Sequence, residues 1–265
     1  MQNKEIIDWR IHAMTTLMSD LPALFPGGPS HKAGSPIYLS HLIKSKKHKY
    51  LGFITPSVVA LSLNISFVSS INAKEIYQLI KFEDSIGPKG NQKKVANEYI
   101  KSLFDYFENC MVSVVFSFQA IESFCNSVLS EDPNKIFKVN YRGKIINKRA
   151  FEIERDSSTE EKLSEIIPQE LNISIPKTDK LWQKFIDLKF VRDSTVHFKS
   201  NDMFSKIENI DDNSLFYLFI KNDPIIYPTS AFEIINYFTK SLGPTPWKSH
   251  IYELISKKQI RVNSY

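Results

Sequence analysis

The chain has 265 residues, of which 42% are hydrophobic and 24% charged, and its formal net charge is +5. This composition is typical of globular proteins and excludes a disordered or collagen-like chain, while the modest charge permits a polyanionic partner without requiring one. Only eight residues are glycine, although an average share of roughly 7% would give more than twice as many. Because glycine supplies the tight turns of nucleotide-binding loops and many-hairpin β-folds, its scarcity predicts a mainly α-helical protein of one or two domains.

The N-terminal sequence predicts one helix and one ambiguous segment. Apolar residues at helical spacing predict a helix over 4–21 that ends at Pro22. The segment 50–73 carries no charge and is long enough to cross a membrane. Its apolar residues fit a half-buried strand and a helix face equally well. Because Pro56 and many polar side chains interrupt this segment, we expect no membrane span.

Two further helices are predicted before residue 130. The first covers 73–82 and stops at the turn sequence Gly87–Gly90. The second covers 92–129 without any proline or glycine, and the Asp132-Pro133 step closes it. This long pattern predicts either one helix of about ten turns or two helices with an unmarked joint.

The two cysteines, Cys110 and Cys125, both lie in this long apolar pattern. A straight helix would hold them more than about 20 Å apart, so neither a disulfide framework nor a zinc site is expected. The first residues, Met1–Trp9, also lack the basic start, apolar middle and cleavage site of a signal peptide. We therefore expect a cytoplasmic protein with two buried thiols.

The sign of the charge changes twice in the second half of the chain. Residues 135–149 hold six basic residues and no acid, and their sequence predicts a loop or small hairpin. Residues 152–170 hold seven acids and two bases, and Ser158 with Glu161 predicts a capped helix start. Beyond them, the pattern predicts strand-like sequence at 215–220 and helices at 178–199, 230–242 and 247–258.

Familiar catalytic motifs are missing from the sequence. It has no glycine-rich phosphate or dinucleotide loop, no His-Glu-x-x-His and no Gly-x-Ser-x-Gly. Asp156, Glu160 and Lys162 resemble the carboxylates and lysine of a metal-dependent nuclease, but they lie at a predicted helix start, where the helix dipole favours acids. The histidines also lack partners at metal-ligand spacing. We therefore predict no metal and no cofactor.

The segment Phe190–Lys199 contains the residues best suited to catalysis. It places Arg192, one of only six arginines, five positions before His197 on a predicted helix. Asp193 and His197 are four residues apart and can hydrogen-bond, which would orient the imidazole. An arginine fork matches phosphate geometry, and a histidine can transfer protons, so these residues suit transesterification at an RNA phosphate. On an ideal helix, however, Arg192 and His197 point roughly 140° apart.

This segment resembles the Arg-x4–6-His motif of HEPN domains, which are small helical units found in prokaryotic toxins, antiviral nucleases and CRISPR effectors. Here four residues separate Arg192 from His197, and the polar residue that typically follows the arginine is Asp193. The helix around Phe116–Asn126 also resembles a HEPN core helix. The resemblance covers about residues 91–200, and Glu122 and Lys199 would be supporting residues beside Asp193.

The resemblance implies metal-independent RNA cleavage that leaves a 2′,3′-cyclic phosphate. HEPN nucleases usually build their site at a two-fold interface, so a homodimer is expected, and a second chain would complete a site that one helix cannot form. The resemblance also leaves room for an inhibitor or antitoxin protein as a partner. The basic segment 135–149, with Phe137 interleaved, would guide RNA or would be a solvated loop, and its proposed RNA-binding residues are Lys138, Tyr141, Arg142, Lys144, Lys148 and Arg149.

Together these observations predict a HEPN-like helical bundle with N- and C-terminal extensions and at most a small β element. The predicted divisions are an N-terminal extension at 1–88, a helical core at 89–204 and a C-terminal extension at 205–265. We expect an endoribonuclease in antiviral defence or a toxin system. A non-catalytic helical scaffold is the alternative, and a membrane-associated protein, based only on residues 50–73, is the third hypothesis.

Overall fold

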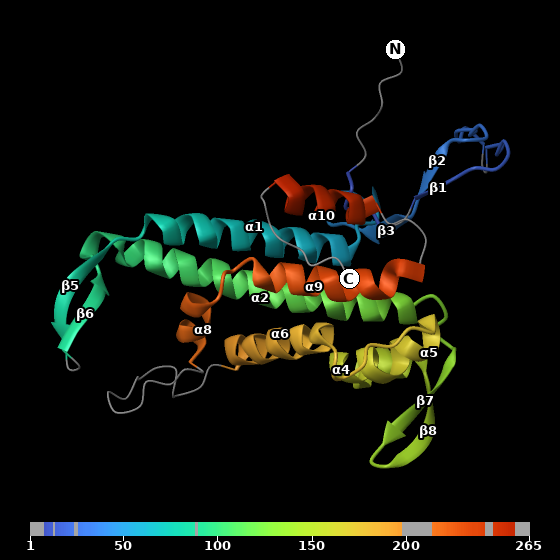
Figure 1. Ribbon diagram of the computed structural model, residues 1–265. Coiled ribbons are helices and arrows are strands. Elements are labelled where there is room, and N and C mark those ends of the chain that lie inside the picture. The colour runs from blue at the N-terminus through green and yellow to red at the C-terminus, as the bar shows by residue number, and fades with distance from the viewer. Residues whose placement is uncertain are drawn as a thin grey trace. The chain divides into compact units, whose positions relative to one another are not determined.

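The computed structural model describes residues 8–12, 14–23, 26–87, 90–197, 214–241 and 246–257. These residues form two compact units, each with its own elements (Figure 1). The helical unit begins at Ser62 and contains most of the helices. The hairpin unit joins the described residues up to Leu61 to the helix α10 (Pro246–Lys257). The division falls within the first helix, α1 (Val58–Leu79).

The helical unit is built around one long helix, α2 (Ile100–Leu129), against which α6 (Lys180–Val196) and α9 (Ile226–Phe238) pack. Nearly every residue of α9 is buried, so this helix lies in the centre of the core. Aromatic rings join the three helices: Phe118 of α2 stacks on Phe185 of α6 with ring centroids 6.1 Å apart. The burial of such large side chains is the main term that stabilises this core.

Helix α1 contacts α2 through small polar side chains. The Ser66 hydroxyl donates to the carbonyl oxygen of Ser113 at 2.8 Å and lies 2.5 Å from the Ser117 hydroxyl oxygen. All three serines are buried. These hydrogen bonds satisfy hydroxyl groups that would otherwise be costly to bury.

Shorter helices complete the helical unit. Between α2 and α6 lie α3 (Ala150–Asp156), α4 (Thr159–Glu161), a π-helical turn (Lys162–Ile166) and α5 (Ile167–Leu171). The expected capping box is confirmed, because the Ser158 hydroxyl accepts from Glu161 N–H and the Glu161 carboxylate accepts from Ser158 N–H. Helix α8 (Leu215–Lys221) precedes α9.

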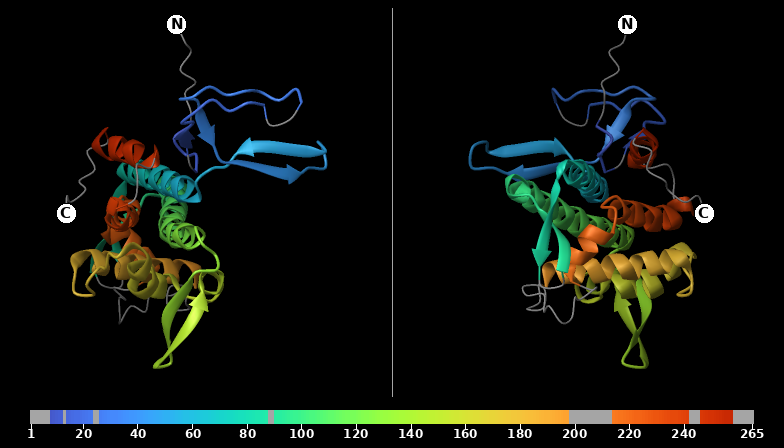
Figure 2. Two further views of the ribbon diagram at one scale, coloured as in Figure 1. Left: turned by 90° about the vertical axis from the view of Figure 1, so that its right-hand side faces the viewer. Right: turned by 60° about the vertical axis from the view of Figure 1, so that its left-hand side comes forward.

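The described residues also form four two-stranded antiparallel sheets. Two belong to the hairpin unit: β1 (Met14–Thr16) with β2 (Pro36–Tyr38), and β3 (Ser40–Lys44) with β4 (Tyr50–Ile54). Two belong to the helical unit: β5 (Phe82–Gly87) with β6 (Gly90–Val95), and β7 (Ile136–Tyr141) with β8 (Lys144–Arg149). Figure 2 shows β3–β4, β5–β6 and β7–β8 as separate paired ribbons.

The predicted fold class is therefore wrong in its β content. The structure is about 57% helical, but the paired strands are a substantial component, so it is not the helical bundle with at most a small β element that was expected. The physical reason is the placement of the glycines. Four of them, Gly27, Gly34, Gly90 and Gly143, adopt positive φ angles between +77° and +93°. A few glycines at turns are enough for several hairpins.

Two local predictions are also wrong. The described part of 4–21 contains no helix, and Met14–Thr16 forms a strand instead. The strand-like sequence 215–220 is the helix α8, capped by the Ser214 hydroxyl, which accepts from Tyr217 N–H. The helix buries Leu215 and Phe219, which lie on one face because they are four residues apart.

The ambiguous segment 50–73 contains both predicted structures in succession. Strand β4 ends at Ile54, and α1 begins at Val58, with Pro56 in the short connection. Among the described helices, only the stretch Asn97–Leu129 is long and apolar enough to cross a membrane by length and composition. Because 56% of its most apolar window is buried in the protein, its apolar side chains are explained by the core of the helical unit.

In the hairpin unit, α10 contacts the N-terminal segment through an aromatic stack. The rings of Trp9 and His250 lie 4.0 Å apart and 13° from parallel. Beside them, the Arg10 guanidinium donates to both carboxylate oxygens of Asp8. This hydrogen bonding lowers the pKa of Asp8 to about 2.

The Asp8–Arg10 pair gives a pH prediction. Because the pKa of Asp8 is lower in the folded protein than in the unfolded chain, the pair stabilises the fold above the unfolded pKa of 3.8 and is lost as the pH falls through about 2. An NMR titration of the Asp8 carboxyl carbon should give a midpoint near 2, and the Arg10→Gln variant should return it toward 3.8. An unchanged midpoint in the variant would contradict this assignment.

Candidate ribonuclease site and basic hairpin

Helix α6 positions the candidate catalytic residues. It begins at the Asp179 cap, whose carboxylate accepts from Leu181 N–H at 2.6 Å. Most apolar side chains of α6 are buried where the helix packs on α2 and α9, whereas Phe190 and Val196 near its end are exposed. The helix ends at Val196, and the backbone N–H of His197 donates to the Asp193 carbonyl oxygen at 2.9 Å. Arg192 and His197 thus lie in the last turn and at the end of one packed helix.

Arg192 is held by an aromatic ring and a carboxylate. Its guanidinium carbon lies 3.9 Å from the centre of the Phe118 ring on α2, which is close enough for a strong cation–π contact. Its Nη1 lies 3.0 Å from a carboxylate oxygen of Asp193. Its Nε is buried and has no hydrogen-bond partner among the described residues. The side chain is therefore fixed in position and partly exposed, while its unpaired Nε is shielded from solvent.

Asp193 is part of a row of alternating charges. Its carboxylate contacts Arg192 at 3.0 Å and lies 3.9 Å from the Lys189 ammonium, which also contacts Glu160 of α4 at 3.2 Å. No contact between the carboxylate of Asp193 and the His197 ring is found among the described residues. Asp193 therefore orients Arg192, whereas its spacing of four residues from His197 predicts that it orients the imidazole.

The remaining predicted residues lie in different environments. The His197 side chain is exposed at the end of α6. Glu122 is an exposed residue of α2, one helical turn beyond Phe118. Lys199 lies outside the described residues.

All six predicted RNA-binding residues belong to the hairpin β7–β8. The strands pair from Ile136 with Arg149 to Tyr141 with Lys144, and Arg142 and Gly143 form the turn. Their φ angles are +52° and +80°, as expected for a type I′ turn that matches the twist of the strands. The hairpin thus carries its basic side chains on a defined backbone, and of the two predicted structures, a loop or a small hairpin, the hairpin is the one present.

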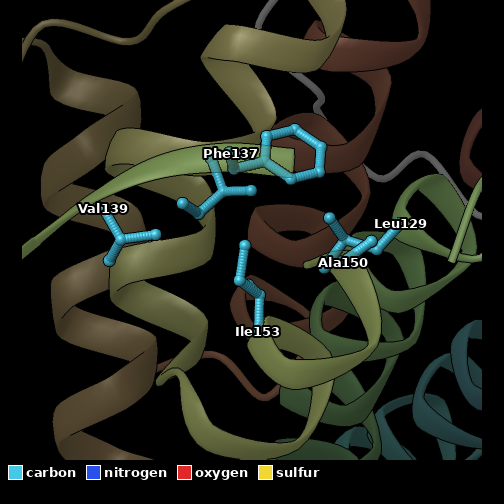
Figure 3. Close-up of a cluster of buried hydrophobic side chains, with 6 residues drawn as sticks. Leu129, Phe137, Val139, Ala150 and Ile153 are labelled. Atoms are coloured by element: carbon cyan, nitrogen blue, oxygen red, sulfur yellow. The ribbon is translucent and has the colours of Figure 1, made fainter. Parts of the chain in front are cut away.

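Buried apolar side chains fix the base of this hairpin to the helical unit (Figure 3). Phe137 and Val139 point from β7 toward Ile153 of α3, and Leu129 and Ala150 lie beside them. Phe137 is only 3% exposed, so it is a core residue and offers no surface for stacking an RNA base. The cluster makes the hairpin a fixed extension of the unit.

Polar contacts from α5 hold the outer edge of β7. The backbone N–H of Lys138 donates to Gln169 Oε1 at 3.2 Å, and Gln169 Nε2 donates to the Lys138 carbonyl oxygen at 2.9 Å. The side-chain amide thereby replaces a neighbouring strand at this edge. Lys135 also forms an ion pair with Glu170, with 2.6 Å between Nζ and Oε2.

Sequence reasoning missed the role of Lys162, which is almost fully buried in the π-helical turn. Its ammonium donates to Asn126 Oδ1 at 2.9 Å and to the Glu154 carbonyl oxygen near the end of α3 at 2.8 Å. Of the other two residues in the trio that resembled a metal-dependent nuclease, Asp156 pairs with Arg155 and Glu160 with Lys189. The three side chains thus make three separate structural contacts.

The described residues contain no group of three histidines, cysteines or carboxylates that could hold a metal ion. Cys110 and Cys125 are free and buried, and burial raises the pKa of each thiol to about 12. Thiols with such high pKa values remain protonated near neutral pH and are poor nucleophiles. The side chains at the end of α6 are therefore the stronger candidates for catalysis.

Comparison with protein-family models, with curated proteins and with solved structures found no match to this chain.

Proposed function

We propose that the protein is a metal-independent endoribonuclease in which Arg192 and His197 act on the scissile phosphate. The observation that supports this function best is the pairing of an arginine, held by Phe118 and Asp193 with its side chain 25% exposed, with an exposed histidine at the end of the same helix. The proposal also rests on the resemblance of this segment to the HEPN Arg-x4–6-His motif. The substrate is RNA, because the reaction uses the ribose 2′-hydroxyl.

In the proposed reaction, the 2′-oxygen attacks the adjacent phosphorus and the bond to the 5′-oxygen breaks. A base removes the proton of the 2′-hydroxyl, and an acid protonates the leaving 5′-oxygen. His197 acts as either this base or this acid, since histidine is suited to proton transfer near neutral pH. Arg192 stabilises the negative charge that develops on the phosphoryl oxygens.

The proposed active form is a homodimer in the cytoplasm. One helix directs Arg192 and His197 roughly 140° apart in ideal geometry, so a single chain does not present both side chains to one phosphate. A two-fold interface would bring the partner subunit's His197 to the same site, and the two histidines would then act as base and acid. The basic hairpin β7–β8, which lies nearer the beginning of α6 than its end (Figure 1), would hold a more distant part of the RNA backbone.

RNA cleavage in the presence of a chelator tests this proposal. The wild-type protein should cleave labelled RNA in EDTA, and His197→Ala and Arg192→Gln should each lower the rate by about 100-fold or more, the usual contribution of a proton-transfer or charge-stabilising group. His12→Ala removes an exposed histidine elsewhere and should cleave at the wild-type rate. Equal cleavage by wild type and His197→Ala would refute the proposal.

The ion pair of Arg192 with Asp193 favours one alternative, a non-catalytic scaffold in which the arginine is purely structural. The Asp193→Asn variant separates the two functions. A nuclease should lose activity in this variant because Arg192 is no longer oriented, while its circular dichroism spectrum stays unchanged. A scaffold shows no cleavage in any variant, although all of them fold.

A further inference from the structure

The ribbon β3–β4 of the hairpin unit exposes an unusual combination of side chains. Every residue of both strands is exposed, and six of them are large apolar residues. The strands are joined by a loop that contains Lys46, Lys47, His48 and Lys49, and Lys44 ends β3 beside it. Figure 2 shows the ribbon as two paired strands. A two-stranded ribbon is only marginally stable by itself. Apolar side chains that are exposed on such a ribbon therefore indicate a binding surface.

The register divides the apolar side chains between two faces. Leu42 pairs with Gly52, Lys44 with Tyr50 and Ser40 with Ile54, so these residues share one face. On this face Leu42 is 68% exposed, Tyr50 54% and Ile54 47%. Gly52 adds no side chain, so the face is flat around Leu42.

Among the described residues, the lysines of this ribbon have no acidic partners. None of Lys44, Lys46, Lys47 and Lys49 forms an ion pair with a described residue, and the sequence contains no acid between Asp20 and Glu75. The other ribbon rich in lysine, β5–β6, is different. There Lys93 pairs with Asp84 at 2.6 Å and Lys94 with Glu83 at 2.9 Å across the strands.

We propose that the β3–β4 ribbon attaches the protein to an anionic lipid surface. The lysines would contact acidic headgroups, and the flat face with Leu42, Tyr50 and Ile54 would enter the boundary between headgroups and acyl chains. Apolar area and basic charge together give such peripheral binding, and a tyrosine suits this boundary because its ring is apolar and its hydroxyl polar. This attachment requires no membrane-spanning segment.

Other partners fit the ribbon less well. Single-stranded RNA would contact the lysines through its phosphates and stack its bases on aromatic rings. However, Tyr50 and Phe53 lie on opposite faces of the ribbon, and RNA offers no apolar group for the aliphatic side chains to contact. A second copy of the ribbon would bring like charges together at the loop. An anionic membrane is the partner that satisfies both the aliphatic residues and the uncompensated charge.

Vesicle binding by the full-length protein tests the inference. In cosedimentation at low salt, the protein should bind vesicles that contain phosphatidylglycerol and should not bind vesicles of pure phosphatidylcholine. Replacing all four ribbon lysines by glutamine should weaken binding about tenfold or more, since each basic residue near such a surface contributes measurably. Replacing Leu42, Tyr50 and Ile54 by serine should weaken it by a similar factor.

Matched controls come from other surfaces of the same chain. One control replaces Lys81, Lys93, Lys94 and Lys101 by glutamine and removes the same charge, and another replaces the 86% exposed Ile86 by serine. Both controls should bind as wild type does. The inference is overturned if wild type does not bind anionic vesicles, if binding survives either ribbon variant, or if the controls lose it equally. If a ribbon variant binds vesicles as wild type does but no longer binds labelled RNA, the ribbon is an RNA-binding surface and the inference is wrong.

Discussion

The Lys184→Met variant should lower the free energy of unfolding by about 3–5 kcal/mol, the usual cost of leaving one partner of a buried ion pair alone. Lys184 of α6 is hydrogen-bonded to Glu233 of α9, and the Glu233 side chain is only 6% exposed. The variant keeps the aliphatic volume of lysine but removes the cation that compensates this carboxylate. Urea unfolding followed by circular dichroism measures the change.

A double variant separates the charge effect from packing. When Glu233 is also replaced by methionine, no uncompensated charge is left between α6 and α9, so most of the lost stability should return. If the single variant lost less than about 1 kcal/mol, the pair would behave as a solvent-exposed salt bridge, and the assignment of Glu233 to the core would be contradicted.

The Lys162→Ala variant should lower the free energy of unfolding by a comparable amount, about 3–5 kcal/mol. The substitution leaves Asn126 Oδ1 and the Glu154 carbonyl oxygen without their donor and opens a cavity where the aliphatic stem was buried. The same urea unfolding experiment measures this change.

Two further variants identify the source of that loss. Lys162→Met retains the stem and should cost about half as much, because only the two hydrogen bonds disappear. Lys138→Ala alters an exposed lysine and should change stability by less than about 0.5 kcal/mol. An equal loss in the alanine and methionine variants of Lys162 would attribute the whole effect to the hydrogen bonds.

Local sequence signals predicted the elements that depend on neighbouring residues. The Ser158–Glu161 capping box, the helix after Asp179 and the hairpin within 135–149 are all present. The predicted long helix at 92–129 is shorter, because residues up to Val95 belong to strand β6 and α2 begins at Ile100. Periodicity found the apolar helix but did not locate its beginning, which no cap or proline marks.

The elements that were missed depend on contacts that sequence patterns do not record. The apolar run 215–220 resembles a strand, but it is short enough to be a helix segment when Ser214 caps it and Phe219 enters the core. The low glycine count predicts few hairpins, although the described turns use only a few well-placed glycines. Composition gives the number of glycines but not their positions.

The candidate site was predictable only in part. Spacing placed Arg192 and His197 at the end of one helix, and charge placed the basic residues on one hairpin. The cation–π contact with Phe118 joins residues that are far apart in sequence, and the pairing of Asp193 with Arg192 depends on rotamers. Buried Lys162 also gave no sequence signal, because a lysine between acids is usually exposed.

The central claim, RNA cleavage by transesterification through Arg192 and His197, is tested most directly by the products formed in EDTA. The wild-type protein is incubated with a short RNA of defined sequence, and the masses of the fragments are measured by mass spectrometry. The account predicts 5′ fragments that end in a 2′,3′-cyclic phosphate and 3′ fragments that begin with a 5′-hydroxyl, with neither formed by His197→Ala. Intact RNA, fragments with other ends, or the same fragments from His197→Ala would contradict it.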